Sequence, residues 1–251
     1  MSLLSTSARC LLLPGRALLR HAGGVAEETR GEGWDGGLAA LEALLQSRRG
    51  GRGLDIRLSH HFAALHLLPP PPVRLGAGEM GGWLGEKLAA DFGAEVAGWR
   101  LAWQDVPPGH PVPVASLPAD RYQALTDRLS AAGVQPSRVA PWCVAAWDRH
   151  CRALGRGAGW LALAEPGRLA LARVEGGRPV GLGMSRLDAG SAPAAQLAAA
   201  LGRQALHAGV PVGGDVWLLA PEGGADWTPT GSTLGLRPLE GHGVGWGGLL
   251  G

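Results

Sequence analysis

Three histidines lie close together in the first third of the chain, and such a group is the simplest candidate for a metal site. They are His60, His61 and His66. Adjacent residues of a β-strand point to opposite faces of the sheet, so His60 and His61 would not readily bind one ion together. The neighbouring sequence offers no cysteine or carboxylate at a useful spacing. The pattern therefore favours solvated or hydrogen-bonded histidines over a metal site.

The cysteines give a second possible ligand group, Cys143 and Cys151 with His150 between them. Structural zinc sites usually show two closely spaced pairs of ligands, which this spacing does not match. The third cysteine is Cys10. An odd, low count without close spacing predicts no disulfide framework and indicates a reducing compartment.

Carboxylates and nucleophiles are also poorly placed for chemistry. A two-metal nuclease needs acids on the first strand of its sheet, holding ions roughly 3.5–4 Å apart. The two segments that would form such strands, residues 8–13 and 160–164, contain no acid. The chain has no Gly-x-Ser-x-Gly motif and no Gly-x-x-x-x-Gly-Lys-Ser/Thr motif. These patterns argue against a nuclease, a serine hydrolase and a P-loop enzyme.

One motif occurs twice in the chain. Residues 11–19 form an apolar run, a Pro-Gly-Arg turn and a second apolar run, and residues 161–171 repeat this order. Short apolar runs around a Pro-Gly turn are typical of a β-hairpin. We therefore expect hairpins over 8–22 and 160–174, each opening one of two related lobes.

The remaining elements follow from hydrophobic periodicity. We expect a polar loop over 23–37, and then a helix through Leu38 and Leu45. Pro69–Pro72 should form a stiff connector. Further strands are expected over 54–58, 62–68, 96–103, 112–117, 134–139, 180–186, 216–220 and 233–239. Further helices are expected over 80–92, 120–133, 141–154 and 193–208.

The second lobe has the order of three strands, a helix and a strand, which is typical of a ribonuclease H-like unit. The first lobe shows the same order less clearly. We predict an α/β protein with mixed α+β sheets and two ribonuclease H-like lobes. The expected parts are an N-terminal lobe, 1–155, with a strand–helix subdomain inserted at about 69–140; a C-terminal lobe, 156–240; and a mobile tail, 241–251.

Composition restricts the partners. The chain has 251 residues, 46% of them hydrophobic, and a net charge of +2. This predicts a packed globular protein without the concentrated basic face of a nucleic-acid binder. The first apolar run is interrupted by Pro14 and is too short for a signal peptide. No run approaches the roughly 20 apolar residues of a membrane span. We expect a cytoplasmic protein that does not insert into a membrane.

Tryptophan is unusually frequent, with ten residues against one tyrosine and two phenylalanines. Most should fill the core. Trp34, Trp227 and Trp246 instead lie in glycine-rich segments. Exposed tryptophan is a favoured interface anchor, so these three are candidate contacts for a partner protein.

The order of these features resembles a known family. The paired hairpins, helix 120–133, the proline-led helix 141–154 and the run from Trp160 to Gly167 carry the resemblance, which covers roughly residues 8–240. The chain is similar to degenerate actin-like ATPases of the pilus and secretion group, which includes PilM, MshI and the cytoplasmic domain of GspL. The resemblance implies an actin-like ATPase architecture.

In nucleotide-binding members of this superfamily each hairpin turn resembles Asp-x-Gly. The carboxylate holds or orients a water, and the backbone N–H groups face the phosphates. Leu13 occupies the first acidic position here and can neither coordinate Mg²⁺ nor polarise water. Glu165 keeps the second carboxylate, but Pro166 removes a backbone donor. By this resemblance, the contacts of a bound nucleotide would be Gly15, Glu165, Gly167, Gly223 and Gly224.

The resemblance thus implies a scaffold of a type IV pilus or type II secretion system, with no catalytic residue, metal or cofactor. Expected partners are inner-membrane assembly subunits, an assembly ATPase or copies of the chain itself. GspL-like and MshI-like proteins continue into a transmembrane helix. Because this sequence shows none, we expect it to reach the membrane through a partner or not at all. The alternative is an active ATPase or small-molecule kinase that uses ATP and Mg²⁺. A catalytically dead nucleic-acid binder is a third hypothesis, which the scattered charge disfavours.

Overall fold

The chain folds as two compact units, residues 1–141 and 142–251. The computed structural model describes residues 8–21, 24–46, 53–152, 154–155, 157–222, 226–228, 234–240, 242–243, 245–246 and 250. The boundary lies before Trp142, earlier than the expected boundary after residue 155. The reason is that Trp142 packs edge-to-face on Trp246 of its own unit, with ring centroids 5.8 Å apart.

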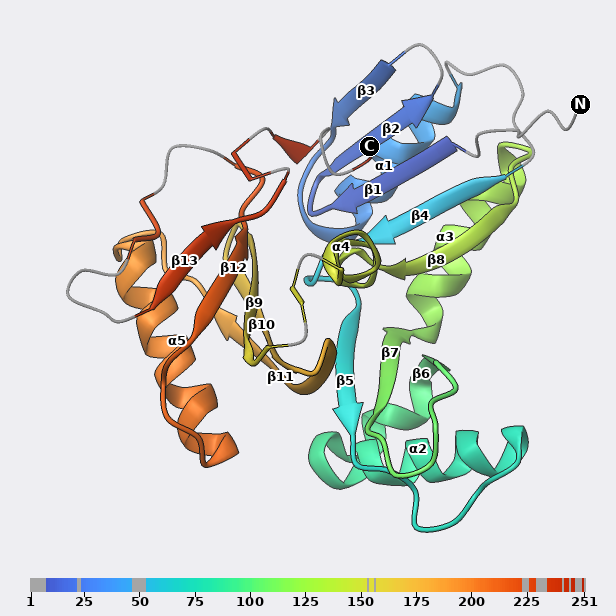
Figure 1. The fold of residues 1–251 in the computed structure, drawn as a ribbon. Coiled ribbons are helices and arrows are strands. Elements are labelled where there is room, and N and C mark those ends of the chain that lie inside the picture. The colour runs from blue at the N-terminus through green and yellow to red at the C-terminus, as the bar shows by residue number, and fades with distance from the viewer. Residues whose placement is uncertain are drawn as a thin grey trace, which may run out of the picture. The chain divides into compact units, whose positions relative to one another are not determined.

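The first unit is built on a five-stranded sheet with the order β3-β2-β1-β4-β8 (Figure 1). Its strands are β1 (Ala8–Leu13), β2 (Arg16–His21), β3 (Gly24–Thr29), β4 (Leu54–Leu58) and β8 (Pro136–Pro141). β1, β2 and β3 form an antiparallel meander, whereas β4 is parallel to β1 and to β8. The two hairpin strands occur where the Pro-Gly turn predicted them.

Two helices cover one face of this sheet (Figure 1). They are α1 (Gly33–Gln46) and α3 (Ala119–Ala131). Leu54, Ile56 and Leu58 of β4 alternate with half-buried polar residues, and these three pack into a core with the buried leucines of both helices. The period of two in the sequence therefore matches the face that the strand buries.

The segment expected to be a loop, residues 23–37, is largely regular, and that prediction is wrong. It contains β3 and the start of α1. β3 pairs only with β2 and has an exposed, glutamate-containing sequence. Strong hydrophobic alternation is absent because such an edge strand has little apolar surface to bury.

A small subdomain is inserted between β4 and α3. Its elements are β5 (Ala64–Leu68), α2 (Ala77–Phe92), the 3-10 helix η1 (Gly93–Gly98), β6 (Trp99–Trp103) and β7 (Val112–Pro118). The antiparallel sheet has the order β5-β7-β6 and packs on α2 through Leu84, Leu88 and Val114. The subdomain spans 64–118 rather than about 69–140, because α3 packs on the first sheet and β8 is one of its strands.

The second unit repeats the first sheet with the order β11-β10-β9-β12-β13. Its elements are α4 (Trp142–His150), β9 (Gly159–Glu165), β10 (Arg168–Glu175), β11 (Arg178–Arg186), α5 (Pro193–Ala208), β12 (Asp215–Leu219) and β13 (Gly235–Pro238). β9, β10 and β11 form the meander, and β12 is parallel to β9 and to β13. α5 packs on one face through Leu197 and Leu201. The mixed α/β class and the two similar lobes are as predicted.

The C-terminal segment was expected to be mobile, but its described residues are packed. Gly243 donates its N–H to the carbonyl of Ala220 over 2.8 Å. Trp246 is 2% exposed and Leu250 is fully buried. The segment therefore belongs to the second unit, since its backbone continues alongside β12.

Candidate functional site

The carboxyl ends of the parallel strands are where ligands bind in open α/β sheets, and each unit has a hairpin turn at this place. Leu13 pairs with Arg16 across the first turn, as Glu165 pairs with Arg168 across the second. The glycine of each turn has a positive φ, 68° at Gly15 and 74° at Gly167. Only glycine adopts this conformation at little cost. The two turns are therefore structural counterparts.

A backbone hydrogen bond extends each meander beyond its turn. The carbonyl of Gly15 accepts from the N–H of Arg30 over 2.8 Å. The carbonyl of Gly167 accepts from the N–H of Leu187 over 3.0 Å. In both units the residue that follows the third strand thus returns to the turn.

The first turn is closed by the start of α1. Gly15 donates its N–H to the carbonyl of Gly33 over 2.8 Å. A Cβ atom on Gly15 would lie 2.5 Å from the carbonyl oxygen of Gly31, and one on Gly36 would lie 3.0 Å from Cα of Gly15. The N–H that would have to face a phosphate is already used inside the unit. Gly15 is buried as a result.

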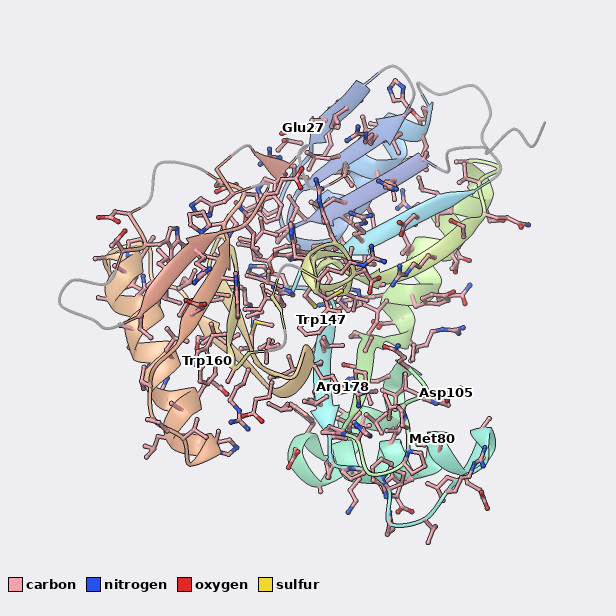
Figure 2. The ribbon with its side chains drawn as sticks, viewed as in Figure 1. Glu27, Met80, Asp105, Trp147, Trp160 and Arg178 are labelled. Atoms are coloured by element: carbon pink, nitrogen blue, oxygen red, sulfur yellow. The ribbon has the colours of Figure 1, made fainter. Side chains whose placement is uncertain are left out.

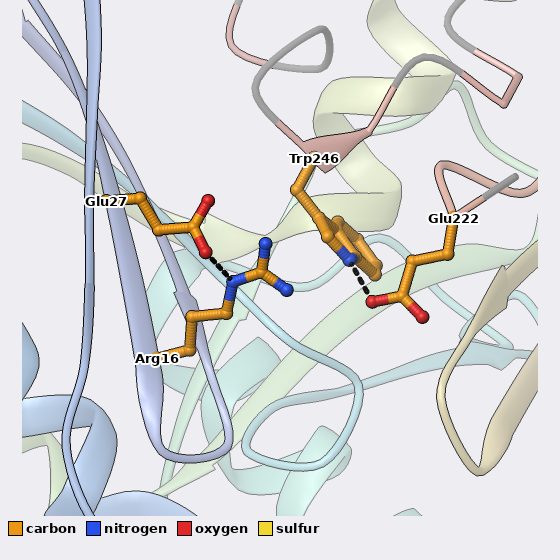
Figure 3. Close-up of polar contacts among 4 residues, drawn as sticks. All are labelled: Arg16, Glu27, Glu222 and Trp246. Atoms are coloured by element: carbon orange, nitrogen blue, oxygen red, sulfur yellow. Dashed lines mark hydrogen bonds and ion pairs between the residues drawn. The ribbon is translucent and has the colours of Figure 1, made fainter.

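The side chain at the expected acidic position of the first turn is aliphatic. Leu13 is buried, with 5% of its surface exposed. The nearby Arg16 forms an ion pair with Glu27 of β3, with 2.6 Å between Nε and the carboxylate (Figure 3). Leu13 and Glu27 do not fit the metal position of a magnesium-bound nucleotide, because the aliphatic side chain cannot bind the ion and the Glu27 carboxylate is paired with Arg16.

The second turn retains the carboxylate. Glu165 ends β9 and is 3% exposed, whereas Pro166 and Gly167 are exposed. Burial, and then the charge of Glu165, raise the pKa of the Cys143 thiol to about 12. Cys143 is therefore a neutral thiol beside a buried carboxylate and not a nucleophile or metal ligand at neutral pH. Among the described residues, no acceptor for the Gly167 N–H corresponds to Gly33.

The segment after β12 is covered by the C-terminal segment. Gly223 and Gly224, the expected adenosine contacts, lie outside the described residues. Just before them, the carbonyls of Ala220 and Pro221 accept from the N–H groups of Gly243 and Gly245, each over 2.8 Å. The second unit thus covers this strand end with its own backbone.

Two side-chain hydrogen bonds hold the C-terminal segment against the end of β12. Nε1 of Trp246 donates to the carboxylate of Glu222 over 2.8 Å (Figure 3). Ala220 donates its N–H to Nδ1 of His242 over 3.1 Å. Nδ1 must be unprotonated to accept this bond, and partial burial lowers the pKa of His242, which favours the neutral ring.

The candidate tryptophans have different positions from those expected. Trp227 is 7% exposed and packs in the core on α5, and Trp246 is buried. Both are core residues, so the premise that they are exposed anchors is wrong. Trp34 is half-buried against Phe62, with ring centroids 4.9 Å apart, and the Arg121 guanidinium lies 5.9 Å from its ring. The interaction hypothesis remains only for Trp34.

The histidines do not assemble into a ligand group. His60 and His61 lie in a turn after β4 rather than in a strand. Nε2 of His66 hydrogen-bonds the hydroxyl of Ser116 over 2.8 Å, and burial lowers the pKa of this histidine. Within the described part of the chain, no three histidine, cysteine, aspartate or glutamate residues gather as a metal site would require.

Sequence reasoning missed the residues that close both strand ends. Gly33 and Gly36 close the first turn, and Glu222 and His242 hold the second cover. The density of glycine over residues 31–37 was an available signal, because such spacing within a helix start indicates close backbone approach. No local pattern marks Glu222 or His242, since their partners lie more than twenty residues away.

Comparison with known proteins identifies the fold. No protein-family model and no curated protein matches the sequence. Among solved structures, a Bacteroides thetaiotaomicron protein of unknown function with an actin-like ATPase fold matches with a TM-score of 0.56 and 10% identity over 85% of this chain and 81% of that one. The chain therefore has an actin-like ATPase fold, as expected.

Two further structures are pilus and secretion proteins. The cytoplasmic domain of EpsL, an inner-membrane component of the Vibrio cholerae type II secretion system, matches with a TM-score of 0.56 and 17% identity over 97% of this chain and 91% of that one. The PilM–PilN type IV pilus biogenesis complex contains a chain that matches with a TM-score of 0.61 and 14% identity over 85% of this chain and 80% of that one. The expected structural resemblance to the pilus and secretion group is confirmed.

Proposed function

We propose that this chain is a non-catalytic cytoplasmic scaffold of a bacterial type IV pilus or type II secretion system. It would act by presenting surfaces to other assembly proteins, among them inner-membrane subunits that recruit it to the membrane. In the part of the chain that the structure describes, no helix has the length and apolar character of a membrane span.

The observation that carries the proposal is the closed first turn. Leu13 stands where the superfamily's chemistry needs an acid, and the Gly15 N–H is bonded to Gly33. To bind a phosphate there, the start of α1 would have to move and an intact backbone bond would have to break. Both changes oppose nucleotide binding.

The structural neighbours support the proposed place of this chain in a pilus or secretion system. EpsL is a secretion-system component of the inner membrane, and the PilM–PilN structure is a pilus biogenesis complex. The same fold therefore occurs in a secretion-system component and in a pilus biogenesis complex. We carry this role to the present chain as part of the proposal.

One observation favours the alternative, an active ATPase or small-molecule kinase. Glu165 lies buried at the end of β9 and Gly167 is exposed in the adjoining turn. A carboxylate and an accessible turn are two of the parts that nucleotide chemistry uses. Both parts belong to the second unit, and Pro166 in the same turn has no backbone N–H to donate to a phosphate.

A thermal-shift measurement with Mg-ATP separates the two functions. Ligand at about 100 times Kd would stabilise a binding protein by roughly 2.7 kcal/mol. We expect no shift for the wild-type chain. The matched variant is Glu165→Gln, which keeps the shape of the side chain and removes its charge. A clear shift that Glu165→Gln abolishes would contradict the scaffold proposal and favour the enzyme.

A further inference from the structure

The sheet of the second unit ends in an edge strand that differs from the other edges of the two five-stranded sheets. β11 lies at the end of the order β11-β10-β9-β12-β13, and among the described strands it pairs only with β10. It has nine residues, and those between Arg178 and Arg186 are all uncharged. Long apolar edge strands favour pairing with another chain, and proteins usually protect them.

The other three edges of the two five-stranded sheets carry the usual protection. The counterpart β3 contains Glu27 and Glu28, each in an ion pair with a nearby arginine. β8 begins and ends with proline, and β13 is four residues long with a proline at its end. β11 has Pro179 near its start and a register shift opposite Arg173 and Val174, which leaves the regular stretch 181–186 open.

The backbone of this stretch offers unpaired groups. Leu187 donates its N–H to Gly167, and hydrogen bonds alternate along an antiparallel strand. The N–H and C=O groups of Leu182 and Met184 therefore point away from β10. Among the described residues, no partner for these groups is found.

The side chains of the stretch have distinct faces. Gly183 faces α5, because a Cβ atom on it would lie 1.8 Å from Nε2 of Gln204. Leu182 and Met184 point to the opposite face, where Leu182 is half-buried and Met184 is 39% exposed. An added strand could thus place apolar side chains beside these two residues, as cross-strand neighbours.

The positive charge at the ends of β11 favours one kind of added strand. Arg178, which is labelled in Figure 2, and Arg186 flank the edge and are exposed, with no ion-pair partner among the described residues. Arg203 donates to the hydroxyl of Ser185 over 3.3 Å at the same edge. The nearby Asp188 already accepts hydrogen bonds from Gly190 and Ser191. A second copy of the chain would bring three more arginines to this edge.

We propose that β11 is a docking edge for an extended segment of another protein, apolar at alternate positions and flanked by carboxylates. The segment adds as a further strand along residues 181–186. Main-chain hydrogen bonds to Leu182 and Met184 provide affinity, and Arg178 and Arg186 favour the acidic flanks. The proposal rests on the scaffold function, for which it names a surface and a class of partner.

The test uses the full chain and a short fluorescein-labelled peptide of alternating valine and threonine with aspartates at both ends. Fluorescence anisotropy should show saturable binding that weakens as salt is raised. The same peptide with lysines in place of aspartates should bind at least roughly tenfold more weakly.

Two variants test the surface. Met184→Pro removes one outward N–H while sparing the bonds to β10, and it should weaken binding by roughly tenfold or more. The double variant Arg178→Glu, Arg186→Glu keeps the backbone and should abolish the preference for aspartate. Val25→Pro is the matched control, because Arg30 bonds Gly15 and the alternation makes Val25 an outward residue of β3. It should bind like the wild type.

Failure of the aspartate peptide to bind, or equal binding of the lysine peptide, would overturn the proposal. So would a dimer in sedimentation velocity that Met184→Pro dissociates, because the edge would then serve a second copy. Nucleotide binding is a separate measurement: a Mg-ATP shift with intact peptide binding contradicts only the scaffold function, and lost peptide binding without a shift contradicts only the docking edge.

Discussion

The two five-stranded sheets have the same strand order, yet they cover their carboxyl ends with different parts of the chain. In the first unit the start of α1 closes the hairpin turn through Gly33 and Gly36. In the second unit Glu165 and an exposed Gly167 remain at the turn, and the C-terminal segment covers the end of β12. The same topology thus contains one hairpin turn that the next helix covers, at Gly15, and one that stays exposed, at Gly167.

The Pro-Gly turn alone therefore does not define a phosphate site. Gly15 and Gly167 have nearly the same φ, but only Gly15 has its N–H bonded to a described residue of the next helix. What matters is the approach of that helix, which depends on small residues at its start.

The largest effect is expected from removing the cover of the second unit. Trp246→Ala deletes a buried indole that packs on Trp142 and bonds Glu222. Its cost should be about 3–5 kcal/mol of unfolding free energy, in the range of other large-to-small core changes. Urea denaturation followed by circular dichroism measures it. Trp246→Phe is the control that keeps the ring packing; a loss below about 1 kcal/mol for the alanine variant would show that the cover is not packed.

The two turn glycines should differ when each is replaced by alanine. Gly15→Ala combines a strained positive φ with a contact of 2.5 Å to Gly31, and should cost about 2–4 kcal/mol. Gly167→Ala meets the positive φ at an exposed position and should cost about 1–2 kcal/mol. Denaturant melts of both variants give the difference. Equal costs would mean that α1 does not close the first turn.

A smaller effect is expected from pH. Burial holds the pKa of His242 below its ordinary value of 6.5, so the unfolded state takes up a proton first as pH falls. This contribution to stability is fully present above pH 6.5 and is lost as pH falls through the folded pKa. Denaturation midpoints at about pH 7.5 and pH 5 should therefore differ less in His242→Asn than in the wild type. Asparagine keeps an acceptor near Nδ1; an unchanged difference would rule out His242 as the titrating group.

The smallest effect is a difference in chemical reactivity among the cysteines. Burial raises the pKa of both Cys10 and Cys143 to about 12, whereas Cys151 is half-buried. Alkylation of the native protein at pH 8, read by mass spectrometry, should modify Cys151 alone, since the thiolate is the reactive form. Rapid modification of Cys143 would show that the helix beside Glu165 opens easily.

Local patterns were sufficient for most elements of the fold. The alternation of Leu54, Ile56 and Leu58 predicted β4, and the Pro-Gly turns predicted both hairpins, because these signals depend on neighbours in the chain. β3 was missed because its surface is polar and its stability comes from pairing with β2. The expected exposure of Trp246 was also wrong, since its partners Trp142 and Glu222 are distant in sequence.

Of the candidate site, too, one part could be predicted from the sequence and another could not. The loss of an acid at Leu13 and its retention at Glu165 can be read directly from the repeated motif. The open edge of β11 could have been noticed as an uncharged run between two arginines, but a strand becomes an edge only through the order of the whole sheet.

The sequence by itself determined the repeated hairpins, the periodicity of the strands and helices, and the absence of a carboxylate at the first turn. These properties follow from residue types and short-range spacing. The tertiary structure alone decided that the Gly15 N–H is occupied, that the C-terminal segment covers β12, and that β11 is left at an edge. Each of these depends on which distant backbone atoms come within hydrogen-bonding distance, and that is set only when the sheets and helices pack.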